Sequence, residues 1–292
     1  MRFTIRVLLP LVALAVMACG GRDAATETLR FTAIPGDNTT DLTEKFGPLE
    51  AYLSEKLGVP VEYVATEDYA ASVEAFINGD VHLAWFGGLT GVRARAAVDG
   101  ARAIAQGKVD PEYRSYFIAN ADAGIEPGEG FPMGIKGKRF TFGSQGSTSG
   151  RLMPEYFIRT FAKMSPQEMF GAEMSFSGSH EKTAKQVEAG TFDAGVMDYK
   201  TYDRLVAEKK LDPNRCFVIW ETPPFPDYNW TAHPALEELF GPGTIRRLQD
   251  VLIGLDRPDL LAAINRPEGL MKAKNEDWDA LAGLARDLGL LR

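Results

Sequence analysis

Short apolar runs alternate with longer segments of helical periodicity in the first part of the chain. The short runs predict strands at residues 29–34, 61–65, 81–86 and 101–105. The longer segments predict helices at residues 42–57, 69–77 and 90–98. Gly58 and Gly79 follow two of these helices, as is typical of helix ends. This alternation predicts a mostly parallel sheet with helices on both faces.

A second alternating set follows a segment rich in Gly and Pro at residues 123–137. A strand at 113–119 leads out of the first set, and the second set contains predicted strands at 138–143, 174–177, 194–197 and 216–221. Its predicted helices are at 149–162, 180–189 and 199–208, and the chain after 226 is mainly helical, at 244–255, 258–264 and 277–288.

These two sets predict an α/β protein with two lobes, each built on a mostly parallel sheet. We expect lobe 1 to contain residues 29–118 and about 231–292, and lobe 2 to contain about 119–230. The chain then crosses between the lobes twice. Open α/β sheets bind ligands beyond the carboxyl ends of their strands, so a ligand cleft is expected between the lobes.

The segment at residues 143–150, Gly-Ser-Gln-Gly-Ser-Thr-Ser-Gly, connects a predicted strand to a predicted helix. The first amides of a helix have no partners within it, and the hydroxyls of Ser147, Thr148 and Ser149 supply further donors. The segment therefore predicts an anion-binding site. Ser and Thr are also common helix N-caps, so ordinary capping is the alternative.

Residues 1–19 have the pattern of a secretory signal peptide, with Arg2 and Arg6 near an apolar run at 7–17. The run is shorter than the roughly 20 residues that span a bilayer. Its end, Val-Met-Ala-Cys, resembles the lipobox of bacterial lipoproteins, which predicts acylation of Cys19 and a polar tether at 20–28. We expect a periplasmic or cell-envelope protein that contacts the membrane only through this lipid; a secreted form without Cys19 is the alternative.

The net charge is −8, and it becomes −10 when the two arginines of the signal peptide are removed. Nucleic acid and acidic membrane surfaces are therefore poor partners, whereas local dipoles can still bind a small anion in a closed cleft. Cys216 has no second cysteine in the mature chain and is expected to be an inert buried thiol. The three histidines show no metal-ligand spacing, so we expect neither a metal nor a cofactor.

Four segments together resemble the substrate-binding proteins of phosphonate-type ABC importers. They occur in matching order at residues 68–75, 78–87, 146–150, and 178–181 followed by 193–196. The resemblance covers essentially all of residues 29–292. Within that group, residues 85–89 and 105–107 look closest to a branch described as putative selenate importers.

The resemblance implies a type II periplasmic binding fold that closes on a tetrahedral oxyanion of the selenate, phosphate, phosphite or phosphonate class. It also implies delivery of this ligand to a membrane permease with its ATPase, without catalysis. We expect a monomer. The expected ligand contacts are the hydroxyls of Ser147, Thr148 and Ser149, the phenols of Tyr69 and Tyr113, and the imidazole of His180.

Asp198 and Asp227 fall near positions where acidic residues of phosphonate receptors meet the amino group of the substrate. A carboxylate that touches the ligand would repel a dianion unless it accepted a hydrogen from the ligand or from a neighbouring donor. Such a contact would therefore favour a protonated or amine-bearing ligand. Both aspartates are equally typical of turns at strand ends.

Several of these side chains have simpler structural explanations. The ring of Tyr69 would also suit the core, and His180 would also suit a helix cap or the surface. Tyr113 and Tyr116 are three apart in a predicted strand, so only one of them is expected to face the cleft.

Two other functions remain open. The same lobes would serve a periplasmic sensor that docks on a histidine kinase. Ser147 with His180 would suit a hydrolase, but the chain has no Gly-x-Ser-x-Gly motif, and three adjacent hydroxyls fit binding better than a single nucleophile.

Overall fold

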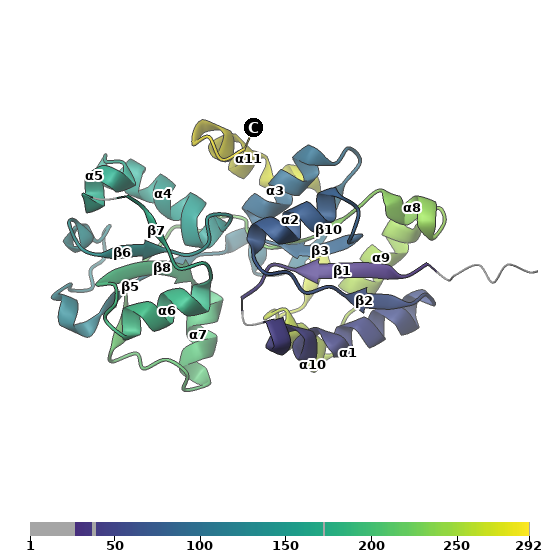
Figure 1. Ribbon diagram of the computed structural model, residues 1–292, viewed down its shortest axis with the longest axis horizontal. Coiled ribbons are helices and arrows are strands. Elements are labelled where there is room, and N and C mark those ends of the chain that lie inside the picture. Colours follow the sequence, from purple (N-terminus) through teal and green to yellow (C-terminus); the bar gives the residue numbers. More distant parts are fainter. Residues whose placement is uncertain (1–26, 37–38, 172, 292) are drawn as a thin grey trace, which may run out of the picture.

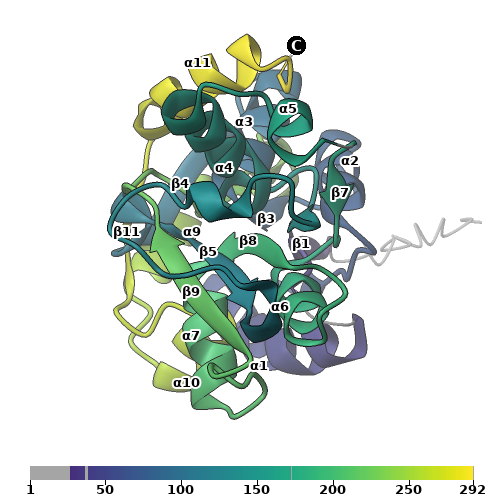
Figure 2. The ribbon, with the colours of Figure 1, turned by 90° about the vertical axis from the view of Figure 1, so that its left-hand side faces the viewer.

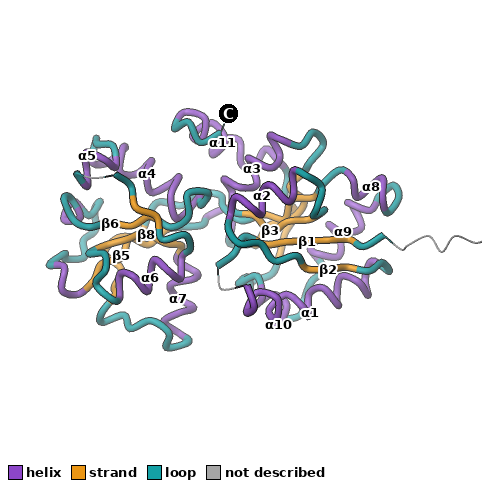
Figure 3. The backbone as a smooth tube through the Cα atoms, viewed as in Figure 1, coloured by secondary structure: helices purple, strands orange, loops and turns teal. Residues whose placement is uncertain are grey.

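The computed structural model describes residues 27–36, 39–171 and 173–291, which form two lobes side by side (Figure 1). The predicted signal peptide, Cys19 and most of the polar tether lie outside the described residues. In Figure 3, strands form the interior of each lobe and helices lie outside them. None of the described helices has the length and apolar character needed to cross a membrane.

Lobe 1 is built on a six-stranded sheet with the order β11-β4-β10-β3-β1-β2. Its strands are β1 (Leu29–Ala33), β2 (Val61–Tyr63), β3 (Leu83–Phe86), β4 (Arg102–Gly107), β10 (Asn229–Ala232) and β11 (Leu270–Lys272). Its helices are α1 (Thr39–Leu57), α2 (Tyr69–Ile77), α3 (Gly88–Ala97), α8 (Ala235–Leu239), α9 (Thr244–Ile253), α10 (Pro258–Ala263) and α11 (Asp279–Asp287).

Lobe 2 is built on a five-stranded sheet with the order β7-β6-β8-β5-β9. Its strands are β5 (Ser115–Asn120), β6 (Phe140–Phe142), β7 (Ser175–Phe176), β8 (Ala194–Asp198) and β9 (Cys216–Glu221). Its helices are α4 (Met153–Phe157), α5 (Pro166–Phe170), α6 (His180–Glu188) and α7 (Tyr199–Ala207). The π-helical turns Thr148–Leu152 and Ile158–Ala162 extend α4 at both ends.

Both sheets are mostly parallel, as expected, but each also contains antiparallel pairings. In lobe 1, β1 runs parallel to β2 and β3, but β10 runs antiparallel to β3 and β4, and β11 antiparallel to β4. In lobe 2, β6 is parallel to β7 and β8, whereas β5 is antiparallel to β8 and β9. The strands β5 and β10 each enter their sheet from the other lobe, so they run against their neighbours.

The two crossovers between the lobes lie side by side and are hydrogen-bonded to each other. Tyr113 and Phe225 exchange two backbone bonds of 2.9 Å, and the Asp227 amide donates to the Asp110 carbonyl at 3.0 Å. Because β5 begins at Ser115, the chain enters the second sheet before residue 118, the expected limit of lobe 1.

Each lobe has its own apolar core, and the C-terminal helix joins the two. Phe31, Leu49 and Leu53 are among the fully buried residues of lobe 1. The side chain of Leu281 on α11 packs in one cluster with Leu89 of α3 and with the lobe 2 core. Figures 1 and 2 show α11 beside α3, at the edge of the molecule where the lobes meet.

Cys216 is fully buried at the start of β9, as the sequence predicts. Burial raises the pKa of its thiol to about 12, so the reactive thiolate form is suppressed.

Candidate oxyanion site between the lobes

The eight residues predicted to contact a ligand converge between the lobes. They come from the starts of α2 and α6, the end of β8, the turn after β6 and both crossovers. Each of these residues is at most 3 % exposed. They are Tyr69, Tyr113, Ser147, Thr148, Ser149, His180, Asp198 and Asp227.

The Ser-Thr-Ser turn caps its helix and also reaches across to lobe 1. Ser147 is the N-cap, and its Oγ accepts a 2.8 Å bond from the Gly150 amide. Thr148 Oγ1 accepts from the Leu89 amide of α3 at 2.9 Å, which joins the lobes directly. The Ser149 carbonyl accepts from Ser115 Oγ at 2.7 Å. Ser147 therefore does cap the helix, but this role uses only one of the three side-chain hydroxyls.

Glycine is required in this turn because the chain passes close to its neighbours. A Cβ on Gly150 would lie 2.9 Å from Ser147 Oγ and 3.1 Å from both Gly143 Cα and His180 Cε1. The small residue thus lets the turn pack against the imidazole.

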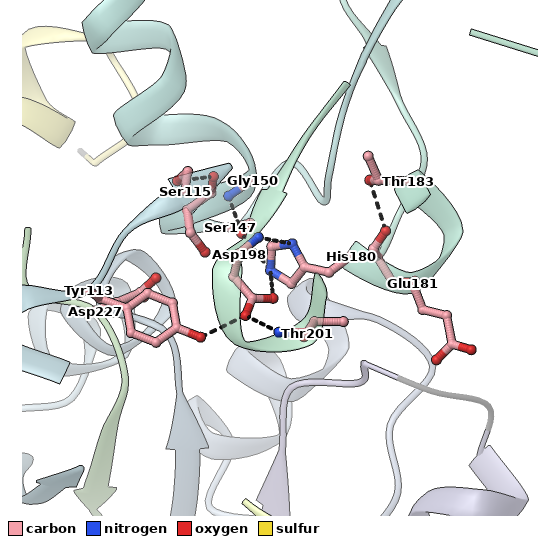
Figure 4. Close-up of polar contacts among 12 residues, drawn as sticks. Tyr113, Ser115, Ser147, Gly150, His180, Glu181, Thr183, Asp198, Thr201 and Asp227 are labelled. Carbon is pink, nitrogen blue, oxygen red and sulfur yellow. Dashed lines mark hydrogen bonds and ion pairs between the residues drawn. The ribbon is translucent and has the colours of Figure 1, made fainter. Parts of the chain in front are cut away.

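His180 is buried and points at the hydroxyl turn rather than at solvent (Figure 4). Its Nδ1 accepts from the Asp198 amide at 3.2 Å, so the neutral ring carries its proton on Nε2. Nε2 lies 3.5 Å from both Ser147 Oγ and Asp198 Oδ2. Burial lowers the pKa of the imidazole. The cap of α6 is Ser179, so His180 has no capping role.

Asp198 links lobe 2 to the first crossover. Its Oδ1 accepts from the Thr201 amide at 2.8 Å, as the N-cap of α7, and from the Tyr113 hydroxyl at 2.7 Å (Figure 4). Burial acts to raise the pKa of this carboxyl, but His180 and the bonds from Tyr113 and Thr201 hold it below its ordinary value. Asp198 is therefore charged, and its Oδ2 has no hydrogen-bond partner among the described residues.

Asp227 lies at the N-terminus of α3, where its Oδ1 accepts from the Gly88 amide at 2.8 Å. Burial raises the pKa of its carboxyl to about 7, although the Gly88 amide and the hydroxyl of Thr148 act in the opposite direction. Its Oδ2 has no hydrogen-bond partner among the described residues. The Trp278 indole donates to the Asp227 carbonyl at 2.7 Å and fixes the backbone here.

Tyr69, Tyr113 and Tyr228 form the phenolic side of the site. Burial raises the pKa of each phenol, so all three are neutral donors. Tyr116 instead packs against Tyr199 and Tyr202 of α7, which leaves Tyr113 as the member of the predicted pair that reaches the site. Tyr228 was not among the predicted contacts, although it follows the predicted Asp227 directly.

A cavity of about 70 Å³ extends from this site. Its walls include Trp85, Tyr113, Asp198, Tyr228 and Arg266. Hydroxyls lie beside the carboxyls of Asp198 and Asp227, and each carboxyl has one oxygen without a hydrogen-bond partner among the described residues, an arrangement that suits an oxyanion carrying a proton or an organic group. The described residues contain no cluster of three or more His, Cys, Asp or Glu able to hold a metal ion.

Two lobes joined by paired crossovers, with a buried polar site between them, define a type II periplasmic binding protein. A family model described as "ABC transporter, phosphonate, periplasmic substrate-binding protein" matches residues 31–278. The chain belongs to this family.

Individual relatives agree with the family. The chain is 34 % identical over 274 residues to a probable ABC transporter phosphite binding protein, PhnD1, of Prochlorococcus marinus, with 91 % of each chain covered. It is 33 % identical over 260 residues to the phosphate-import protein PhnD of Mycolicibacterium smegmatis, covering 82 % of this chain and 77 % of the relative.

Solved structures agree with the fold. The structure of Prochlorococcus marinus PhnD1 in complex with methylphosphonate has a TM-score of 0.85 at 33 % identity, covering 90 % of this chain and 99 % of that one. A phosphonate-transporter binding protein of Pseudomonas aeruginosa has a TM-score of 0.76 at 21 % identity, with 89 % and 85 % covered.

The protein is therefore a non-enzymatic substrate-binding component of an ABC transporter in the periplasm or cell envelope, with a permease and an ATPase as partners. The selenate branch assignment stays a prediction.

Proposed function

We propose that this protein binds a small tetrahedral oxyanion of the phosphite, phosphate or methylphosphonate type at the interlobe site and delivers it to the permease. Ser147, Thr148, Ser149, Tyr69, Tyr113 and His180 are its donors, and Asp198 and Asp227 its acidic residues. The relatives named for phosphite and phosphate, and the one solved with methylphosphonate, support this ligand class.

The single observation that carries the proposal is Asp227, buried beside Thr148 with an unpartnered Oδ2. A carboxyl here attracts an oxyanion only if a proton lies between the two oxygens. Phosphate can supply that proton, and a carboxyl with a pKa of about 7 can supply it near neutral pH. Selenate and sulfate carry no proton at neutral pH, so they depend wholly on Asp227 for it.

The test is thermal unfolding of ligand-free protein with phosphite, phosphate, methylphosphonate, sulfate and selenate. A ligand at about 100 times its Kd stabilises the folded state by about 2.7 kcal/mol, which gives a clear rise in Tm. We expect at least one of the first three to raise Tm, and sulfate and selenate to raise it less above pH 8 than at pH 6. If none of the five changes Tm, the proposed ligand class is wrong.

We also propose that Cys19 is acylated and anchors a monomeric receptor to the membrane. The motivation is the Val-Met-Ala-Cys end of the apolar run. Mass spectrometry of the N-terminal peptide from membrane fractions tests this. A diacyl or triacyl mass on Cys19 is expected, and an unmodified N-terminus beyond Cys19 would contradict it.

A further inference from the structure

We infer that Arg266 determines specificity at this site by opposing ligands whose organic group carries a positive charge. This inference rests on the proposed function and narrows it to oxyanions with an uncharged substituent. Arg266 lies outside every predicted motif, and the residue forms part of the wall of the 70 Å³ cavity.

Arg266 reaches the crossovers because the chain reverses after α10. Asn265 has a φ of 54°, in the left-handed region that Asn tolerates, and the Arg266 amide then bonds the Leu261 carbonyl at 2.8 Å. The side chain turns inward and is only 2 % exposed.

The positive charge of Arg266 is balanced by the carboxylate of Asp110 in the first crossover. Its Nε and Nη2 donate to the Asp110 carboxylate at 2.7 to 2.9 Å, and Nη1 donates to the Asn265 carbonyl at 2.8 Å. The Gly107 amide also donates to Asp110, at 2.7 Å. Asp110 is not part of the cavity wall, so the positive member of the pair is the one that faces the cavity.

Three aromatic rings hold the guanidinium in place. Its central carbon lies 4.6 Å from the ring centre of Tyr228, 5.0 Å from that of Tyr113 and 5.4 Å from that of Trp85. All three rings line the same cavity. An arginine clamped by a carboxylate and three rings cannot swing away to make room for a second cation.

Asp198 would by itself favour the opposite specificity. Asp198 lines the cavity, and its Oδ2 lies 3.5 Å from His180 Nε2 but accepts no hydrogen bond from the described residues, so it would suit an ammonium group on a ligand. Tyr113 lies between the two charges, with its hydroxyl on Asp198 and its ring against Arg266. Arg266 thus offsets the attraction of Asp198 for a cationic substituent while it favours the anionic part of the ligand.

The test compares two ligands of nearly equal size, ethylphosphonate and aminomethylphosphonate, whose terminal groups are methyl and ammonium. Their Kd values are measured by calorimetric competition with methylphosphonate, in wild-type protein and in the double variant Arg266→Met/Asp110→Asn. The double change removes both buried charges, so no uncompensated ion is left in the core. Arg266→Lys is the matched control that keeps the charge.

We expect the ratio of Kd for aminomethylphosphonate to Kd for ethylphosphonate to fall about twofold in the double variant, because the loss of the Asp110 charge cancels much of the effect of losing the Arg266 charge. That is the difference between opposite unit charges about 10 Å and about 14 Å away at an effective dielectric constant of about 20. The ratio should stay at the wild-type value in Arg266→Lys. Lys45 and Arg204 also line the cavity, but they are present in every variant and cancel from the comparison.

A purely structural role would change both Kd values in parallel and leave their ratio constant. A ratio that does not fall in the double variant overturns the inference and leaves the proposed function intact. Arg266→Gln/Asp110→Asn is judged by the same criterion if the methionine variant does not fold. Failure of wild-type protein to bind methylphosphonate would instead count against the proposed function itself.

Discussion

Replacing Asp227 with Asn is predicted to stabilise the ligand-free protein, and to do so more at high pH than at low pH. The carboxyl is buried, and its pKa rises from 3.8 to about 7 on folding. The folded state therefore prefers the protonated form. The stability that goes with this preference is fully present below the unfolded pKa and is lost as pH rises through the folded one.

The size of the effect follows from the shift. Each pKa unit corresponds to about 1.4 kcal/mol, so the cost of ionising Asp227 approaches roughly 4 kcal/mol above pH 8. At pH 5, the free-energy cost that this pKa difference imposes on the folded state is roughly 1.7 kcal/mol. Asn keeps an oxygen for the Gly88 amide and has no charge to desolvate. The advantage of Asp227→Asn over wild type should thus be about 2 to 3 kcal/mol larger at pH 8 than at pH 5.

Urea denaturation of both proteins at pH 5 and pH 8, without ligand, measures this difference. The matched control is Asp99→Asn, at an exposed aspartate of lobe 1. A stability difference between Asp227→Asn and wild type that is the same at both pH values, within about 0.5 kcal/mol, would refute the reasoning. It would mean that water or a neighbouring group solvates this carboxylate in the folded state.

Three further predictions follow from the contacts at the site. Tyr113→Phe removes the hydroxyl that donates to the charged Asp198, so unfolding in urea should show a loss of about 1 to 3 kcal/mol, absent in Tyr156→Phe at an exposed tyrosine. NMR titration should give His180 an imidazole pKa below 6.5, because burial disfavours the charged ring; a midpoint above 6.5 would contradict its placement. Gly87→Ala places a Cβ 3.2 Å from Asp227 Oδ1 and should weaken oxyanion affinity several-fold in calorimetry, whereas Gly47→Ala, with open space around it, should not.

Most elements of the fold could be predicted because their periodicity is local. The helix at 69–77 and the strand at 216–221 have the predicted limits. β10 was missed because Asn229–Ala232 is short and polar in part, and it becomes a strand only by inserting between β3 and β4. β11 has three residues and depends in the same way on β4. A strand that is stabilised mainly by pairing with neighbouring strands leaves little signal in its own sequence.

Site residues that are contiguous in sequence could also be predicted, whereas those brought together only by folding could not. The Ser-Thr-Ser turn at 147–149 was predicted because its three hydroxyl residues are adjacent in sequence, and Tyr69 and His180 were predicted from the family resemblance. Arg266 could not be found, because only tertiary folding brings it to Asp110, 156 residues away. The raised pKa of Asp227 was equally hidden, since it depends on burial between two lobes.

The central claim is that the Ser147 turn binds the oxyanion rather than merely capping its helix. Calorimetric titration of Ser147→Ala with methylphosphonate, or with whichever oxyanion binds wild type most tightly, tests this directly. Ser165→Ala is the matched control, because Ser165 caps α5 in the same way and is outside the site. We predict that affinity falls by about 5- to 100-fold in Ser147→Ala, the equivalent of roughly 1 to 3 kcal/mol for a hydrogen bond to a charged group, and is unchanged in Ser165→Ala. Equal affinity in wild type and both variants would contradict the account and leave Ser147 with a capping role alone.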